Sequence, residues 1–216
     1  MPKIYFCSDT HFNHSNILKY EEARRYFIWK KYYKKKLNIS WEAFDKWVLD
    51  CFEKDESEQL QLFLNIHDNL IIEQWNNTVS KDDTVWFLGD FCFGKQSNVA
   101  KYKERLNGNI RLITGNHDFY SEKVYLAAGF KSVSKYPVIL KQHFILSHAP
   151  LEIIINDELT KFHNIFGHVH SSKDYLTEAA NYTCVCLERW DLKPIKLAMF
   201  DSYQEPEFEE YTSLKN

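Results

Sequence analysis

Short apolar runs alternate along the chain with small polar clusters. The ranges 3–8, 84–88 and 110–114 each predict a buried strand, and 144–147 and 164–166 predict two shorter ones. Each run is followed at once by Asp, Asn or His, often beside a glycine. Because ligands of open α/β sheets bind just beyond the carboxyl ends of the strands, we expect the five polar clusters to converge on one place.

The segments between these strands carry apolar residues at helical spacing. Helices are expected at 21–36, 41–52, 60–75, 96–106 and 121–128. After Tyr182, the segments TCVCLERW and IKLAMF return to strand character. The acidic, polar tail from Asp201 is expected to be ordered only in part.

Composition narrows the class of protein. At 216 residues, 44% of them hydrophobic and 16% aromatic, the chain suits one folded domain. A net charge of −3 does not indicate a nucleic-acid or membrane binder. The opening MPKIYFCSD reaches an aspartate before a signal-peptide core forms, and no run approaches the roughly 20 apolar residues that span a bilayer. Five scattered cysteines without CxxC favour a reducing compartment, so we expect a cytoplasmic protein without a membrane partner.

The polar clusters contain the side chains of a metal site. A single strand-end histidine is more often a packing or turn residue, but six of the nine histidines lie in these clusters: His11, His14, His117, His148, His168 and His170. The other three, His67, His143 and His163, are expected to be surface or packing residues. Imidazoles with carboxylates and an amide oxygen suit Mn, Fe, Zn, Co or Ni better than Mg or Ca. Two such cations, roughly 3.5–4 Å apart, clamp a phosphate for in-line displacement.

Read in order, the clusters form a recognisable series. They are Asp9-Thr10-His11, Gly89-Asp90, Gly115-Asn116-His117-Asp118, His148 and Gly167-His168-Val169-His170. With these motifs the chain resembles the calcineurin-like metallophosphoesterase superfamily, and DTHFNHSNI and DDTVWFLGDF resemble its small bacterial and phage branch in particular. RLNGNIRLITGNHD and ERWDLKPIKL extend the resemblance to about residue 197. It implies an α/β fold, a two-sheet β-sandwich flanked by helices, in a single domain spanning 1–216.

The resemblance also implies a role for each motif residue. Asp9, His11 and His170 would bind one metal, Asn116, His148 and His168 the other, and Asp90 would bridge the two. His117 would then be no ligand but a catalytic residue that donates to the leaving oxygen or stabilises negative charge, with Asp118 orienting its ring. The alternative is that His117 only braces Asn116.

The chain departs from the small branch in two places. Asn13 stands where that branch usually has glycine, and it adds bulk near the site; Asn13 and His14 are candidate substrate contacts, although His14 could also cap the first helix. A helical insert at about 26–67 has no counterpart in the short members. Its lysines, Lys34 and Lys35 among them, are interleaved with aromatic residues. They belong either to a solvated helix face or to a basic, aromatic cap that contacts the substrate.

We therefore expect a hydrolase of phosphate esters that uses two divalent metal ions, with Mn first and Fe, Zn, Ni or Co as other candidates. The near-neutral charge favours a small phosphodiester substrate, such as a nucleotide or a cyclic nucleotide. A nuclease acting on DNA or RNA is the alternative that the basic insert supports. A non-catalytic metal-binding scaffold is a weaker one, because every motif position is intact.

Overall fold

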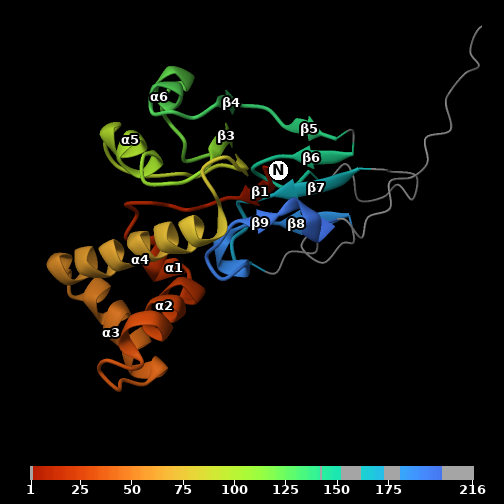
Figure 1. Cartoon of the computed structure of the whole chain (residues 1–216). Coiled ribbons are helices and arrows are strands. Elements are labelled where there is room, and N and C mark those ends of the chain that lie inside the picture. Colours follow the sequence, from red (N-terminus) through yellow and green to blue (C-terminus); the bar gives the residue numbers. More distant parts are fainter. Residues whose placement is uncertain (1, 142, 152–161, 173–180, 201–216) are drawn as a thin grey trace, which may run out of the picture.

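Two mixed β-sheets form the centre of the computed structural model, which describes residues 2–141, 143–151, 162–172 and 181–200 (Figure 1). The first sheet has the order β4-β3-β2-β1-β9 and contains β1 (Ile4–Cys7), β2 (Thr84–Phe87), β3 (Asn109–Ile113), β4 (Ser132–Ser134) and β9 (Ile195–Lys196). The second has the order β5-β6-β7-β8 and contains β5 (Val138–Leu140), β6 (Phe144–Leu146), β7 (His163–Phe166) and β8 (Tyr182–Cys184). Strands β1 to β4 are parallel, as are β6 to β8, whereas β9 and β5 are antiparallel to their neighbours.

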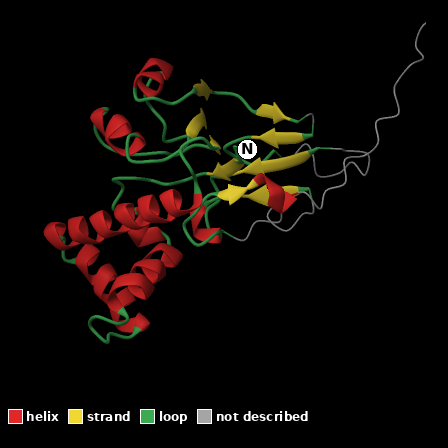
Figure 2. Cartoon of the chain, viewed as in Figure 1, coloured by secondary structure: helices red, strands yellow, loops and turns green. Residues whose placement is uncertain are grey.

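The apolar strands are buried on both faces. Phe6 of β1 lies between the sheets and shares a core with Leu146 and Ile165 of the second sheet. Its neighbours Tyr5 and Cys7 point to the opposite face, where the helices cover the sheet (Figure 2). This double burial explains the unbroken apolar runs, since both sets of alternating side chains are inside. The two sheets with flanking helices confirm the expected fold class.

The helices are α1 (Ile17–Tyr20), α2 (Glu22–Ile28), the π-helical turn η1 (Trp29–Tyr33), α3 (Trp41–Glu53), α4 (Ser57–Thr78), α5 (Ser97–Lys103) and α6 (Glu122–Ala127). Residues 17–78, called the helical lobe below, extend away from the sheets (Figure 1). The lobe has its own core, in which Phe44 of α3 packs near Phe63 of α4. The later part of α4 packs on the first sheet through Ile71 and Trp75, so this helix joins the lobe to the sheet.

Several elements differ from the sequence prediction. The helix expected over 21–36 changes at Trp29 into a π-helical turn, and the buried Trp29 indole donates to the Ile39 carbonyl. IKLAMF forms only the two residues of β9 before a 3-10 helix, Leu197–Phe200. TCVCLERW leaves the sheet at a second 3-10 helix, Leu187–Arg189, where Leu187 turns into the core beneath the helices. The strands β4 and β5 were not predicted, because they have three residues each and lack buried runs.

The polar tail from Asp201 lies outside the described residues. Among the helices of the described part, none combines the length and apolar character needed to cross a membrane.

Candidate metal centre

The strand ends meet at one edge of the two sheets. Parallel pairing sets β1 level with β2 and β2 level with β3, so their following loops start side by side. The Asp9 N–H donates to the Gly89 carbonyl at 2.9 Å, which ties the first two loops together. The Gly167 N–H donates to the His148 carbonyl at 2.7 Å and does the same for the loops of the second sheet.

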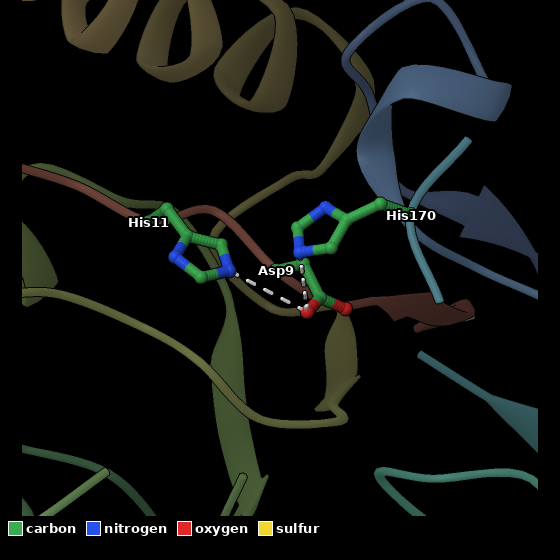
Figure 3. A group of neighbouring side chains, drawn as sticks. All are labelled: Asp9, His11 and His170. Carbon is green, nitrogen blue, oxygen red and sulfur yellow. Dashed lines mark ion pairs between the residues drawn. The ribbon is translucent and has the colours of Figure 1, made fainter. Parts of the chain in front are cut away.

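The first ligand group consists of Asp9, His11 and His170, which point toward one another (Figure 3). His11 Nε2 and His170 Nε2 each lie 3.6 Å from Asp9 Oδ1. Asp9 Oδ1 and His11 Nε2 are buried and have no hydrogen-bond partner among the described residues. Buried polar atoms are nearly always satisfied, so orphaned ones that face each other fit a cation held between them.

The second group is centred on Asn116, His148 and His168. The Asn116 side-chain oxygen lies 2.8 Å from His148 Nε2 and 2.9 Å from His168 Nδ1, and those two nitrogens are 3.1 Å apart. Asp90 lies between the two groups, with Oδ2 3.6 Å from His11 Nε2 and 3.6 Å from His148 Nε2. The structure therefore brings all seven predicted ligands together, with Asp90 within 3.6 Å of a histidine from each group.

The backbone of this centre is strained. Five of the seven predicted ligands have positive φ, namely Asp9 (57°), His11 (47°), Asp90 (61°), His168 (71°) and His170 (51°). Such conformations cost roughly 1–3 kcal/mol each and concentrate at functional sites. Gly115 cannot be replaced without disturbance, because a Cβ there would overlap Asp90 Oδ1. The strained backbone conformations are therefore located at the predicted ligands themselves.

Electrostatics favour a cation at this place. Burial lowers the pKa of His11 to about 4 and also lowers that of His168, so both imidazoles are neutral and have a free lone pair. Burial also acts to lower the pKa of His170, but the hydrogen bond to Glu188 and the charge of Asp9 raise it to about 9. Burial and the charge of Asp9 raise the pKa of Asp90 to about 7. The negative charge of Asp9, which favours a proton on His170 and on Asp90, equally favours a divalent cation between these side chains.

Sequence reasoning missed two residues behind the centre. Glu188 Oε1 lies 2.6 Å from His170 Nδ1, and an Arg24 guanidinium nitrogen lies 3.1 Å from Glu188 Oε2. Both Glu188 and Arg24 side chains are fully buried. The available signal was a glutamate directly after the apolar run 184–187, at a place where burial of a charge requires a partner.

His117 lies at the edge of the centre. Its N–H donates to Asp90 Oδ1 at 2.8 Å, and its ring centroid is 5.8 Å from that of His11. The ring also lies 5.0 Å from the Phe93 ring. This position leaves the imidazole beside the predicted metals without joining either ligand group.

Asp118 has other partners than expected. Its Oδ2 accepts hydrogen bonds from the N–H groups of Asp90 and Gly115 at 2.8 and 2.9 Å, and Oδ1 accepts from the Phe91 N–H at 3.1 Å. We expected this carboxylate to orient the His117 ring. The hydrogen bonds instead fix the loops after β2 and β3 to each other, because three backbone donors point at one side chain.

The candidate substrate contacts divide into two sets. His14 Nδ1 lies 3.2 Å from His11 Nδ1, and the His14 ring stacks on Phe93 with centroids 3.8 Å apart, so His14 borders the centre. The Asn13 N–H donates to Asp68 Oδ2 at 3.0 Å, and its side-chain amide donates to the Phe93 carbonyl.

Lys34 and Lys35 belong to a different part of the surface. They line a shallow depression whose other walls are Trp29, Asn38, Ile39 and Ser40, all within the helical lobe. The Lys34 ammonium lies 5.2 Å from the centre of the Trp29 ring. The segment 34–40, between η1 and α3, is at the end of the lobe away from the sheets (Figure 1). The structure therefore does not bring these lysines to the strand ends.

A set of imidazole, carboxylate and amide side chains at the strand ends of a two-sheet sandwich is an arrangement that suits divalent metal ions and a phosphate ester. A family model described as calcineurin-like phosphoesterase matches residues 2–199, and the chain belongs to this family. Its members generally hold two divalent metal ions and hydrolyse phosphate esters.

Individual relatives cover less of the chain. An uncharacterized protein of Methanocaldococcus jannaschii is 35% identical over 125 residues, which are 57% of this chain and 51% of that protein. The Gene 66 protein of Mycobacterium phage L5 is 42% identical over 55 residues, 24% of this chain and 27% of the phage protein. The matched part thus spans about half or less of these relatives. The crystal structure of a protein of unknown function from Aquifex aeolicus aligns with a TM-score of 0.56 at 21% identity, over 94% of this chain and all of that one, and supports the fold.

Proposed function

We propose that this chain hydrolyses small phosphodiesters, with two divalent ions bound by the seven strand-end residues. Asp9, His11 and His170 would hold one ion, Asn116, His148 and His168 the other, and Asp90 would serve both. The observation that carries the proposal is a pair of buried atoms, Asp9 Oδ1 and His11 Nε2, that have no hydrogen-bond partner in the described part of the chain. Manganese is the first candidate, because the site mixes imidazole nitrogen with carboxylate and amide oxygen.

Bound ions of this kind neutralise phosphate charge and lower the pKa of a coordinated water. The protein's own contribution begins with the neutral imidazoles, which burial keeps free to bind a cation. His117 is hydrogen-bonded through its backbone to Asp90, and we assign to its ring the donation of a proton to the leaving oxygen of the ester. Asp118 holds the loops that carry Asp90 and Asn116 at a fixed separation.

Aromatic side chains beside the centre support a nucleotide substrate. Phe93 stacks on His14, and Phe119, 76% exposed, has its ring 5.9 Å from that of His117. An exposed aromatic ring next to a phosphate-binding site offers a stacking surface for a planar base. A net charge of −3 provides no extended positive field for a polynucleotide, which favours a nucleotide or cyclic nucleotide over DNA or RNA.

A hydrolysis screen of the manganese-loaded protein tests this proposal. The panel holds phosphomonoesters, cyclic and linear nucleotide diesters, and short oligonucleotides, with Asp90→Asn as the inactive control. We expect the highest kcat/KM for small nucleotide diesters and a weak dependence on salt. A preference for oligonucleotides that falls steeply with salt would indicate a nuclease instead. A preparation that holds two ions per chain but hydrolyses nothing would overturn the enzymatic role and favour a binding scaffold.

We also propose a cytoplasmic location. All five cysteines are buried and free, and the sulfurs of Cys184 and Cys186 lie 3.3 Å apart as thiols. This state of two adjacent cysteines is typical of a reducing compartment. Localisation of a tagged full-length chain by fractionation tests it, and recovery outside the cytoplasm would contradict it.

A further inference from the structure

A buried chain of polar side chains connects His170 to helix α4. His170 Nδ1 lies 2.6 Å from Glu188, and Glu188 pairs with Arg24 at 3.1 Å. A second nitrogen of Arg24 lies 3.1 Å from His67 Nε2, and His67 Nδ1 lies 2.9 Å from Asp68 Oδ1. Of these five residues only His170 has any appreciable exposure. His67, expected as a surface or packing residue, is thus part of a buried network.

The contact with Glu188 fixes how the His170 ring is used. A carboxylate accepts only from a protonated nitrogen, so Nδ1 donates to Glu188 and the other nitrogen faces Asp9 Oδ1 at 3.6 Å. A carboxylate behind a metal-binding histidine sets the ring orientation and raises the basicity of the ligating nitrogen. Loss of such a partner typically weakens metal binding about 10–100-fold.

Arg24 holds Glu188 and the first motif at the same time. Its guanidinium donates to the backbone carbonyls of Asp9 and Thr10 and pairs with both oxygens of Glu188. One side chain therefore braces the loop after β1 against the segment after β8. The two terminal nitrogens of this buried guanidinium are paired, while Nε has no partner among the described residues. The terminal contacts therefore compensate the buried charge.

Helix α4 closes the network from the other side. His67 accepts from Arg24 through Nε2 and donates to Asp68 through Nδ1. Asp68 Oδ2 accepts hydrogen bonds from the Tyr102 hydroxyl at 2.6 Å and from the Asn13 N–H at 3.0 Å. The position of Arg24 is thereby set by a helix that belongs to the lobe, and by a loop of the site itself.

We propose that Glu188, held by Arg24 and through it by α4, is a positioning residue that fixes His170 as a ligand of the cation beside Asp9 and His11. This inference rests on the proposed function for the identity of that cation, a divalent metal ion. Glu188 acts through His170 and contacts no substrate. The helical lobe thereby supports the metal centre, although all seven predicted ligands lie outside it.

Manganese binding to the metal-free protein tests the role directly. Isothermal titration of the wild type should show two ions per chain. In Glu188→Ala, one ion should bind as in the wild type and the other about 10–100-fold more weakly. Glu188→Gln keeps an acceptor for the His170 N–H and should lose less. The manganese concentration that gives half-maximal hydrolysis should rise in parallel, while kcat at saturating manganese recovers.

Asp45→Ala is the matched control. Asp45 pairs with Arg25, the residue after Arg24 in the chain. The Arg25 side chain is only 6% exposed, and this pair does not touch His170. Its loss should lower thermal stability and leave both manganese affinities unchanged. A folded Glu188→Ala protein with two wild-type affinities would overturn the proposal. Should that variant not fold, Arg24→Met with Glu188→Met removes both buried charges together with the acceptor for His170 and supports the same comparison.

The two proposals fail in different ways. A wild-type protein that binds two ions and hydrolyses no ester would refute the enzymatic role alone, since the positioning of His170 is judged from binding. A wild-type protein that hydrolyses esters, together with unchanged affinities in Glu188→Ala, would refute the positioning role alone.

Discussion

The strand-end centre and the core of the helical lobe differ in the kind of side chain that they bury. The centre buries carboxylates and imidazoles on a backbone with five positive φ values. The lobe buries aromatic and aliphatic side chains, with Phe44, Trp47 and Phe63 in edge-to-face contacts, and leaves its lysines at the surface. A change in the centre should therefore cost function first, and a change in the lobe should cost stability first.

The two regions nevertheless depend on each other. Strained backbone persists only where the surroundings over-determine it. Around Asp9 those surroundings include Arg24 of α2, and the partner of Arg24 on the lobe side is His67 of α4. Substitutions can establish whether changes in the lobe affect stability alone, or whether those near Arg24 also affect the metal centre.

Asp90→Asn should give the largest effect, because Asp90 lies between the two ligand groups. An amide at this position carries no charge and cannot bridge two cations as a carboxylate does. We expect loss of bound manganese and a fall in kcat/KM beyond the roughly 100-fold that a residue behind a ligand causes. Metal analysis and hydrolysis assays measure both. Full metal content with normal turnover would refute the two-metal assignment.

His117→Ala should separate chemistry from metal binding within the centre. Both ions should remain, and the rate for esters with poor leaving groups should fall about 10²–10⁴-fold, the usual contribution of a general acid. Nitrophenyl esters should be affected less, since nitrophenolate leaves without a proton. Equal losses on both ester types would show instead that His117 only braces Asn116.

The difference between the regions also decides what the sequence could predict. The predicted ligands follow apolar strands in a fixed order, so the convergence of Asp9, Asp90 and His148 at one place could be predicted from the sequence alone. Glu188 and Arg24 could not, because a single charged residue becomes informative only when its burial and its partner are known. The short half-buried strands β4 and β5 were missed for a similar reason, since pairing and not pattern defines them.

Phe44→Ala should affect stability alone. Phe44 is fully buried in the lobe core, and its truncation should cost about 3–5 kcal/mol in the free energy of unfolding. Urea denaturation measures this cost. Below the unfolding transition, manganese affinity and kcat should match those of the wild type. A weaker metal site in the folded variant would show that packing throughout the lobe, and not only the Arg24 contact, supports the centre.

His67→Leu tests the support that Arg24, the lobe residue in contact with Asp9 and Glu188, receives from α4. Without the imidazole, Arg24 loses an acceptor on the α4 side, so we expect one manganese ion to bind more weakly, by less than the roughly 10–100-fold of Glu188→Ala. His67→Gln, whose amide oxygen can accept from Arg24, should recover part of the affinity. Phe44→Ala serves as the comparison, because it destabilises the lobe without changing this acceptor. Wild-type affinity in folded His67→Leu would confine the network to Glu188 and Arg24.

Replacing Lys34, Lys35 and Lys36 with alanine should give the smallest effect. All three are exposed, and the depression that contains Lys34 and Lys35 is lined by lobe residues only. A basic cap would bind substrate equally in the ground and transition states, so its loss would raise KM and leave kcat unchanged. Because these lysines lie at the end of the lobe away from the sheets, we expect neither constant to change for nucleotide diesters. The control is Lys46→Ala with Lys54→Ala, on α3 and at its C-terminal cap. A rise in KM confined to oligonucleotides, and absent from that control, would show that the lobe binds a longer substrate; the lobe would then contribute to function as well as to stability.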